Sequence, residues 1–338
     1  MKYKYFISIW KGLIEIKRII SSYYSSNTAK YRIVGYIHGA TTNVNPNKLT
    51  HINYAFGSII NSSIFIPDYQ NLMNLVSLKS QNPKLMVILS IGGWGAEGFS
   101  DAAYLESSRS SFANSCLDIV NKYGIDGIDI DWEYPVSGSC NLIKCTPKDK
   151  ENFTLLLKSI RNKIGTNKIL SIAAGADKFY INNVEINGIV NICDYINLMT
   201  YDFGYNTHNA NLYPTSSPYG SGFSCDESVN IFLQAGVPAM KINLGIPFYG
   251  YHGHEYLSYG NLLENYINKN GWTRYWDYEA KAAYLKNDDS FITYEDEESI
   301  DYKIKYIKSK GLGGAMFWEY NQDYNDILLN KLWTGLNE

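Results

Sequence analysis

Eight short apolar runs, separated by segments with helical periodicity, constrain the fold of this 338-residue chain more than any other feature. Each run is rich in Val, Ile, Leu and aromatic residues, which is typical of strands buried on both faces. Buried strands that alternate with helices predict parallel pairing with right-handed crossovers. The clearest helical segments are residues 108–122 and 147–163. The runs span residues 31–37, 51–56, 85–91, 125–131, 169–174, 195–199, 242–246 and 314–318.

A (β/α)8 TIM barrel is the most economical closure for eight such units in one chain. The runner-up is a doubly wound open sheet, which usually carries a glycine-rich phosphate loop after its first strand. Neither GxGxxG nor GxxxxGK[ST] occurs in the sequence. Residues 251–270, between the seventh and eighth runs, are rich in His and Tyr and have no core pattern of their own. We expect a loop or short helix there and no large insertion domain, because so few residues cannot build an independent core.

The pattern divides the chain into an N-terminal segment, residues 1–30, and one domain, residues 31–338. Lys2 and Lys4 precede the apolar residues 6–10, which is typical of a weak signal peptide. Charged residues then interrupt the apolar run, so it is too short to span a bilayer. A linker or a peripheral amphipathic segment is the alternative for these residues.

Composition excludes several classes of partner. The formal net charge of −3 gives no basic field for nucleic acid and no strong membrane signal. The 30 Tyr and seven Trp residues suit a sugar-binding cleft, because flat rings stack on pyranose faces, although biased codon usage would also enrich Tyr. Cys140 and Cys145 share one loop and are either a disulfide or two free thiols. His252 and His254 lack further ligands at metal-site spacing, so we expect no metal and no other cofactor.

The fourth run carries the strongest functional signal, because residues 126–135 read DGIDIDWEYP. In a strand, Asp129, Asp131 and Glu133 project to one side while the apolar residues between them project to the other. Three carboxylates on a buried face repel one another, so one or two of them hold protons near neutral pH. A metal-binding strand or an exposed acidic edge is the structural alternative. The apolar residues at every other position argue against the exposed edge, and the row predicts a catalytic site at the carboxyl rim of the barrel.

DGIDIDWEYP resembles the DxxDxDxE signature of glycoside hydrolase family 18, the chitinase family. The resemblance covers nearly all of the chain after residue 30, and it implies the (β/α)8 barrel already inferred. The order of the motifs around one acidic strand makes the match specific. Further segments that resemble the family's motifs are residues 34–36, 53–56, 90–94, 199–202, 245–250 and 313–318.

The resemblance implies a retaining, substrate-assisted mechanism in which the 2-acetamido oxygen of the substrate acts as the nucleophile. Glu133 would protonate the glycosidic oxygen and then activate water. Asp131 would hold the acetamido N–H, and Asp129 would share a proton with Asp131. Tyr201 would donate a hydrogen bond to the acetamido oxygen. Asp126 matches the first acid of the motif but projects toward the helices, so we interpret it as structural.

The resemblance also implies seven residues that line the sugar-binding cleft. Trp318 would form the floor under the reacting sugar, and Trp94 would stack on a sugar further along. Core packing explains Met199 and Phe56 equally well. Tyr251 stands where the family commonly has Arg, which leaves the contacts at that position open. The predicted substrate-binding residues are Trp318, Trp94, Asp202, Met199, Tyr36, Tyr249 and Phe56.

The resulting hypothesis is a secreted, monomeric endochitinase whose partners are chitin or chitooligosaccharides. An endo-β-N-acetylglucosaminidase acting on N-glycans or peptidoglycan would use the same catalytic residues. A chitin-binding lectin on the same barrel is the alternative from another class, and relatives of that kind lack the acid that Glu133 supplies. The short segment after the seventh strand predicts an open cleft, and hence endo cleavage with low processivity.

Overall fold

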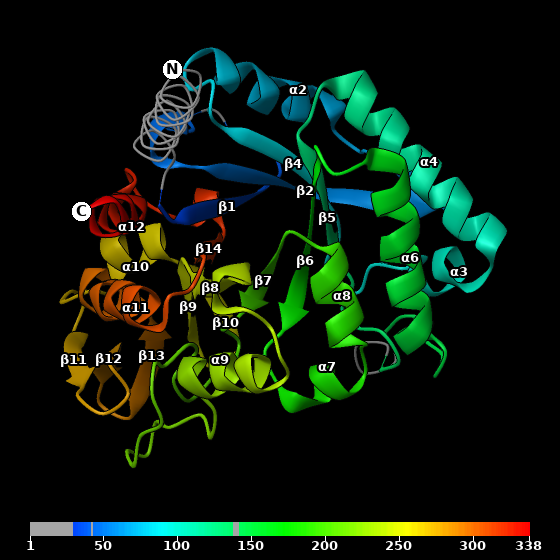
Figure 1. The fold of residues 1–338 in the computed structure, drawn as a ribbon. Helices are drawn as coiled ribbons and strands as arrows, with labels where there is room; N and C mark the ends of the chain where they lie inside the picture. The colour runs from blue at the N-terminus through cyan, green and yellow to red at the C-terminus, as the bar shows by residue number, and fades with distance from the viewer. Residues whose placement is uncertain (1–29, 42, 138–141) are drawn as a thin grey trace, which may run out of the picture. The chain divides into compact units, whose positions relative to one another are not determined.

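Eight parallel strands close into a barrel in this computed structural model, which describes residues 30–41, 43–137 and 142–338. The first strand, β1, pairs with both the second and the last barrel strand, so the barrel is closed. All eight predicted runs are confirmed as strands, and the predicted barrel is confirmed (Figure 1). A ninth strand, β3 (Ser63–Phe65), pairs antiparallel with β2. In the order of pairing around the barrel, the strands are β1 (Arg32–His38), β2 (His51–Ile60), β4 (Met86–Gly92), β5 (Gly127–Asp131), β6 (Ile169–Gly175), β7 (Tyr195–Met199), β8 (Ile242–Pro247) and β14 (Gly314–Trp318).

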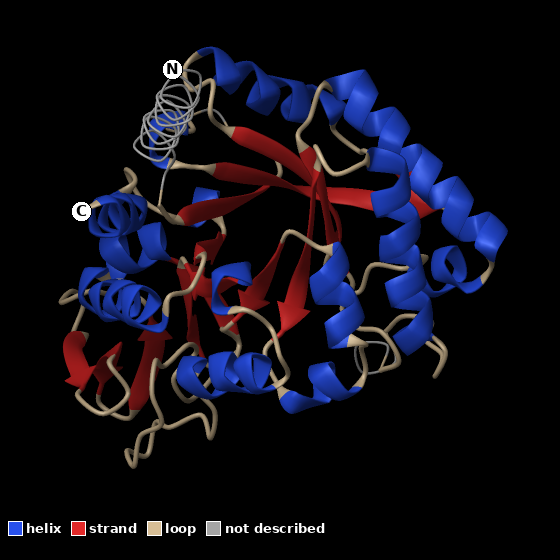
Figure 2. Ribbon diagram, in the orientation of Figure 1, coloured by secondary structure: helices blue, strands red, loops and turns tan. Residues whose placement is uncertain are grey.

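Helices cover the outside of the barrel strands (Figure 2). The predicted helices at 108–122 and 147–163 are confirmed as α4 and α6, which pack against each other (Figure 1). Among the helices described, none is both long enough and apolar enough to cross a bilayer. Their bounds are α2 (Tyr69–Ser77), α3 (Phe99–Tyr104), α4 (Glu106–Tyr123), α6 (Asp149–Ile164), α7 (Lys178–Asn182), α8 (Ile186–Ile192), α9 (Cys225–Gln234), α10 (Tyr259–Asn265), α11 (Glu297–Lys310) and α12 (Ile327–Asn337).

The side chains of β5 and the residues after it alternate as the sequence predicts. Ile128, Ile130 and Trp132 belong to the large apolar core between strands and helices. Trp132 stacks on Phe99 of α3, with 5.2 Å between ring centroids and 13° between ring planes. Asp129 is fully buried and points into the barrel instead. The outward apolar residues therefore anchor β5 to its helices while the acidic residues face the barrel interior.

Asp126, just before β5, lies apart from this interior row. Its carboxylate accepts hydrogen bonds from Lys79 Nζ at 2.7 Å and from the backbone N–H of Val87 at 2.8 Å. Both partners come from the segment that leads from α2 into β4. Asp126 thus ties the start of β5 to its neighbour, in agreement with the structural role expected for it.

A five-stranded antiparallel sheet lies between β8 and β14 in the chain, in the order β10-β9-β13-β12-β11. The short helix predicted within residues 251–270 is confirmed as α10, but the prediction of loop for the preceding residues is wrong, because they form the hairpin of β9 and β10. Strand β9 also pairs with β13, which lies far along the chain. The local sequence pattern therefore did not reveal that these residues form a strand. The strands are β9 (Tyr249–His252), β10 (Glu255–Ser258), β11 (Thr273–Asp277), β12 (Ala282–Asn287) and β13 (Ser290–Tyr294).

The antiparallel sheet shares the core of the barrel. Leu257, Leu262, Leu285 and Ile292 are buried in the same apolar cluster as the residues between barrel strands and helices. The inserted residues therefore form an extension of the barrel, and the prediction that only a loop or short helix lies between the seventh and eighth barrel strands is wrong.

A buried ion pair joins this sheet to α11. Lys303 Nζ lies 2.7 Å from Glu295 Oε1, and the two side chains are 0% and 3% exposed. Ser299 Oγ also donates a hydrogen bond to Glu295, over 2.8 Å. Burial raises the pKa of Glu295, and the Lys303 ammonium opposes that shift. The buried Glu295 carboxylate therefore depends on Lys303 for its counter-charge.

Replacing Lys303 by Met should destabilise the fold by about 3–5 kcal/mol, because it leaves Glu295 buried without a counter-charge. Urea unfolding of the variant measures the change. Lys305→Met is the matched control, because Lys305 lies on the same helix and pairs with Asp301 at the surface over 2.7 Å. The control should keep the wild-type midpoint, since surface pairs contribute little. Equal midpoints for Lys303→Met and the control would contradict the expectation.

Candidate active site

The interior of the barrel is organised around the carboxylate of Asp129. Tyr36 Oη and Ser90 Oγ donate hydrogen bonds to its Oδ2 over 2.7 and 2.8 Å. Ser171 Oγ and Asn197 Nδ2 donate to its Oδ1 over 2.6 and 3.3 Å. Burial raises the pKa of Asp129, and these hydrogen bonds oppose the shift. The four donors come from β1, β4, β6 and β7, so the closed barrel is needed to hold this carboxylate.

A chain of hydrogen bonds supports Asp129 from below. Arg32 Nε donates to Asn243 Oδ1 over 2.9 Å, and Asn243 Nδ2 donates to Asn197 Oδ1 over 2.9 Å. Both side-chain oxygens are thereby engaged as acceptors, so each amide can present only its NH₂ group upward. Arg32 thus fixes, through two amides, the orientation in which Asn197 donates to Asp129.

Asp131 is the second carboxylate of the row and is 4% exposed. Its Oδ1 is buried without a hydrogen-bond partner among the residues that the structure describes. Burial, followed by the negative charges of Glu133 and Asp129, raises the pKa of Asp131 well above its ordinary value. A buried polar atom without a partner is costly, so this oxygen is suited to a group that enters the cavity beside it.

Glu133 lies where two cavities meet. The first, of about 390 Å³, is also lined by Asp131 and Trp318. The second, of about 750 Å³, is also lined by Tyr134 and leads away from the barrel axis toward α7. Burial raises the pKa of Glu133 to about 7; a hydrogen bond with Tyr134 opposes this shift and the charge of Asp202 adds to it. Glu133 can therefore hold or release a proton near neutral pH at the junction.

Aromatic side chains form the floor of the first cavity. Trp318 stacks against Phe56, with 5.6 Å between ring centroids and 19° between planes. Tyr36 and His38 each lie 5.8 Å from the Trp318 ring. These rings come from the carboxyl ends of β1, β2 and β14, so neighbouring strands place them at one rim. Such a floor suits the apolar face of a ring-shaped ligand.

The turn after β4 carries Trp94 to the mouth of the cavity. Gly92 and Gly93 have φ angles of 118° and 93°, a backbone conformation that residues other than glycine rarely adopt. A Cβ atom on Gly93 would also lie 2.7 Å from the Phe56 ring. Trp94, which follows this turn, is 61% exposed and meets Tyr134 edge to face, with 6.4 Å between centroids. The glycines therefore let the chain pass Phe56 and present the indole ring to solvent.

Asp202 anchors the opposite wall. Tyr249 Oη and Tyr251 Oη donate hydrogen bonds to its Oδ1 over 2.6 and 3.1 Å. Tyr251 thus pairs with Asp202 as an uncharged donor. Tyr201 and Met199 line both cavities beside Asp202. The end of β7 and strand β9 together build this wall.

The family profile described as Glycosyl hydrolases family 18 matches residues 20–323. The chain belongs to this family.

Individual proteins and solved structures are also similar to this chain. Chitinase A1 of Niallia circulans is 38% identical, over 90% of this chain and 58% of its own length. The crystal structure of chitinase ChiW from Paenibacillus sp. str. FPU-7 has a TM-score of 0.85 and 40% identity, covering 91% of this chain and 43% of that one. A family 18 N-acetylglucosaminidase from Paenibacillus barengoltzii has a TM-score of 0.85 and 39% identity, covering 90% and 99%. The chain thus spans less than two thirds of Chitinase A1 and of ChiW.

The structure brings together all the residues predicted for the family 18 site. Asp129 lies beneath the first cavity, hydrogen-bonded to Tyr36. The other predicted residues line that cavity: Glu133, Asp131, Tyr201, Trp318, Trp94, Asp202, Met199, Tyr36, Tyr249 and Phe56.

Several residues that line the first cavity were not predicted, among them His38 and Tyr256. His38 follows Tyr36 at i+2 on β1, so strand alternation could have revealed it. Tyr256 comes from β10 and stacks on Tyr249, with 4.5 Å between ring centroids. No local signal indicates Tyr256, because its position depends on the antiparallel sheet.

Two other sequence-based interpretations concern Cys and His residues. Cys140 lies outside the described residues, so its pairing with Cys145 stays open. Across the described ranges, no three His, Cys, Asp or Glu side chains gather in a group able to hold a metal. His252 Nδ1 lies 3.7 Å from Oε2 of Glu255.

The raised pKa of Glu133 predicts a pH-dependent stability difference between the wild type and Glu133→Gln. The folded protein binds this proton with a pKa of about 7, against 4.5 for an ordinary Glu. Wild type should therefore lose stability relative to Glu133→Gln as pH rises through this interval, by on the order of 2–3 kcal/mol in total. Urea unfolding of both proteins across the interval measures the difference. A difference that does not change with pH would mean that Glu133 titrates normally.

Proposed function

We propose that this protein is an endo-acting chitinase that hydrolyses β-1,4-linked N-acetylglucosamine polymers with retention of configuration. The observation that carries the proposal is the buried, unpartnered Oδ1 of Asp131 in the cavity that Glu133 also lines. Membership of family 18 supports it, as do the chitinase names of Chitinase A1 and ChiW.

Glu133 acts as the general acid and later as the general base. With a pKa of about 7 it is largely protonated below neutral pH and can donate to the glycosidic oxygen. The carboxylate that remains then activates the water that completes hydrolysis. Its place between the two cavities puts the scissile bond at their junction, with one part of the polymer in each.

Asp131 and Tyr201 orient the acetamido group of the sugar in the first cavity. Asp131 accepts the acetamido N–H at its unpartnered oxygen, which turns the acetamido oxygen toward C1. Tyr201, which also lines this cavity, donates its O–H to that oxygen. The acetamido oxygen then attacks C1 as Glu133 protonates the leaving group, and the substrate itself serves as nucleophile.

Asp129 raises the proton affinity of the neighbouring Asp131. Its charge is one cause of the raised pKa of Asp131, and we propose that the two acids share a proton that shifts during the reaction. Asp129 can hold negative charge in a buried place because its four hydrogen-bond donors replace water.

The aromatic rings bind the sugars. Trp318 packs under the reacting sugar, and Trp94 stacks on the next one, where the two cavities join. Tyr36, Phe56 and Tyr249 enclose the reacting sugar. Met199 and Asp202 line both cavities and contact sugars on both sides of the scissile bond, as described above. The second cavity leaves room for a polymer beyond the bond, which favours endo cleavage.

We also propose that residues 31–338 form the catalytic domain of a secreted monomer. A polymer of this kind is met outside the cell, which supports secretion. Residues 1–29, for which a signal peptide or a linker is predicted, lie outside the described residues.

The test is release of a fluorophore from an aryl N,N′-diacetylchitobioside, together with cleavage of chitohexaose. Wild type should hydrolyse both, and Glu133→Gln should lose about 10²–10⁴-fold in activity while it still binds chitohexaose. Glu255→Gln is the matched control, because Glu255 is an exposed carboxylate on β10 that lines neither cavity, and it should keep wild-type rates.

Each alternative has its own outcome in this assay. A lectin would bind chitohexaose without releasing fluorophore. An N-glycan endo-β-N-acetylglucosaminidase would release little fluorophore but would cleave a glycopeptide. An N-acetylglucosaminidase, as the Paenibacillus barengoltzii relative is named, would release monosaccharide from the first minutes. Any of these patterns would replace the endochitinase proposal.

The substrate-assisted mechanism predicts a β-anomer as the first product. Attack by the acetamido oxygen and then by water each inverts C1, so the two steps together retain the configuration. Rapid NMR of chitohexaose hydrolysis distinguishes the anomers before mutarotation. An initial α-anomer would indicate direct displacement by water and would contradict the roles given to Asp131 and Tyr201.

A further inference from the structure

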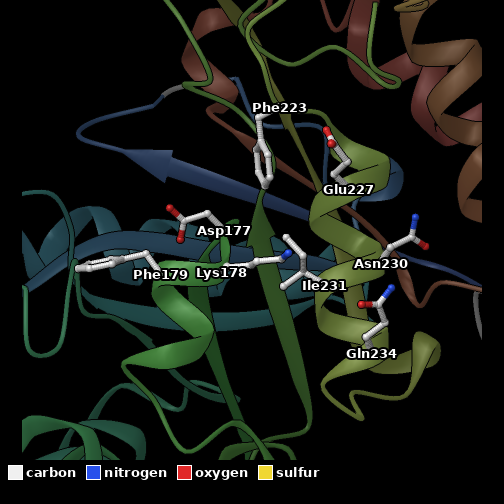
Figure 3. Close-up of a pocket in the computed structure, with 8 residues that line it drawn as sticks. All are labelled: Asp177, Lys178, Phe179, Phe223, Glu227, Asn230, Ile231 and Gln234. Atoms are coloured by element: carbon white, nitrogen blue, oxygen red, sulfur yellow. The ribbon is translucent and has the colours of Figure 1, made fainter.

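The loop that joins β7 to α9 begins and ends at the cleft. Asp202 lies at its start and lines both cavities of the active site. Phe223 lies at its end, just before α9, and also lines a cavity of about 550 Å³ between α7 and α9 (Figure 3). The rings of Phe203 and Phe223 pack edge to face, with 5.2 Å between their centroids. The two ends of the loop therefore meet beside the active site.

The backbone of Asp202 is left-handed, with a φ angle of 60°. Residues other than glycine adopt this conformation at a cost, and they keep it where the surrounding contacts determine it. The hydrogen bonds from Tyr249 and Tyr251 hold only the carboxylate of Asp202. The turn after β7 therefore depends on contacts to the backbone of Asp202 itself.

Asn209, further along the loop, makes those contacts. Its side-chain Oδ1 accepts a hydrogen bond from the backbone N–H of Asp202 over 2.7 Å, and its backbone oxygen accepts one from the N–H of Phe203 over 3.0 Å. Two successive N–H groups thus converge on one residue, as in other turns that contain a left-handed position. Nδ2 of Asn209 is buried and has no hydrogen-bond partner among the described residues. The bond to Asp202 is therefore the one hydrogen bond that the described chain gives this side chain.

The antiparallel sheet fixes Asn209 in turn. Asn209 is 1% exposed, and its backbone N–H donates to Thr293 Oγ1 on β13 over 2.7 Å. Thr293 pairs with Tyr251 on β9, and the Tyr251 hydroxyl donates to the carboxylate of Asp202 over 3.1 Å. Two paired residues of one sheet therefore hold Asp202 at both ends, its carboxylate directly and its backbone through Asn209.

The residue before Asn209 anchors the loop a second time. His208 is fully buried, and its Nε2 lies 3.1 Å from Oδ2 of Asp277, at the end of β11. Burial lowers the pKa of His208, and the hydrogen bond with Asp277 opposes that shift. Thr215, also in this loop, donates to the same Asp277 oxygen over 3.0 Å. The middle of the loop is thus tied to the sheet on both sides of the peptide bond between His208 and Asn209.

We propose that Asn209 is a positioning residue, which holds Asp202 in the left-handed conformation that directs its carboxylate toward Glu133. This inference rests on the proposed function, in which Glu133 is the general acid. Asn209 itself lines neither cavity, so it acts on the reaction only through Asp202.

The consequence of this placement is a change in the proton affinity of Glu133. Burial is the main cause of its raised pKa, and the charge of Asp202 adds to the shift. Displacement of Asp202 should therefore lower the pKa of Glu133. None of the other ionisable groups that interact with Glu133 hydrogen-bonds to Asn209 in the described chain; they are Asp131, Tyr134, Tyr180 and Tyr201.

The test measures the pKa of Glu133 by carbon-13 NMR of its carboxyl carbon, with Glu133→Gln identifying the signal. Asn209→Ala should lower this pKa by on the order of half a pH unit, because the negative charge of Asp202 moves away. The alkaline limb of kcat/KM on the aryl N,N′-diacetylchitobioside should move to lower pH in step, because a general acid must be protonated to act.

Asn211→Ala is the matched control, because Asn211 is an equally buried asparagine of the same loop, at 1% exposure. Its Nδ2 donates to the backbone oxygens of Tyr213 and Phe223, so the variant loses hydrogen bonds within the loop and none to Asp202. It should reduce stability without changing the pKa of Glu133. A lowered pKa in both variants, or in neither, would overturn the positioning role.

A pair of variants at Thr293 tests the same link if Asn209→Ala does not fold. Thr293→Val removes the hydroxyl that accepts the Asn209 N–H and should also lower the pKa of Glu133. Thr293→Ser keeps that hydroxyl and should titrate as wild type. An unchanged pKa in Thr293→Val would contradict the proposal.

A double variant shows whether Asn209 acts through Asp202. Asp202→Asn removes the charge, so Asn209→Ala should cause no further change in the pKa of Glu133 on that background. A further change would overturn the proposed route.

The NMR titration does not require catalysis, so it separates this inference from the proposed function. A lowered pKa in Asn209→Ala, with a wild type that hydrolyses no chitin oligomer, would uphold the role of Asn209 and overturn the chitinase. Hydrolysis by wild type, with an unchanged pKa in Asn209→Ala, would do the reverse.

Discussion

A buried carboxylate that four strands must jointly satisfy determines much of this structure. Asp129 is buried, and an unpaired charge in the protein interior would cost several kcal/mol. Its carboxylate instead accepts hydrogen bonds from Tyr36, Ser90, Ser171 and Asn197. No single strand supplies more than one of them, so the carboxylate is tolerated only when the barrel is closed. Below it, Arg32 and Asn243 fix the amide that donates to it. Polar residues therefore occupy interior positions that apolar side chains fill in many barrels.

From Asp129 to Glu133, the three acids have progressively fewer hydrogen-bond partners within the protein. Asp129 has all its donors, Asp131 has an oxygen without a partner, and Glu133 meets two cavities. Asp129 and Glu133 both raise the proton affinity of Asp131 between them, because like charges close together in a dry interior cannot all form. This gradient is the physical basis of the proposed roles: Asp129 shares a proton with Asp131, Asp131 orients the acetamido group, and Glu133 donates a proton.

The cleft around this row draws on elements that are distant in the chain. Barrel strand ends supply Tyr36, Phe56 and Trp318, whereas the antiparallel sheet supplies Tyr251 and Tyr256. Tyr251 donates to Asp202 through a neutral hydroxyl, so this wall adds no positive charge beside the acids. The antiparallel sheet therefore shapes the site as well as extending the core, and the open wall expected from a mere loop is partly built up.

The sequence by itself determined the barrel and the row of acidic residues. Eight buried runs have few ways to pair, and the alternation in residues 126–135 places three carboxylates on one face whatever the neighbours are. Only the tertiary structure decided which donors reach Asp129 and that Tyr256 joins the cavity. Those features depend on contacts between residues far apart in the chain, such as the pairing of Tyr251 with Thr293, for which local periodicity carries no signal. Local sequence determines which residues form strands, whereas contacts between distant parts of the chain determine which strands and side chains pair.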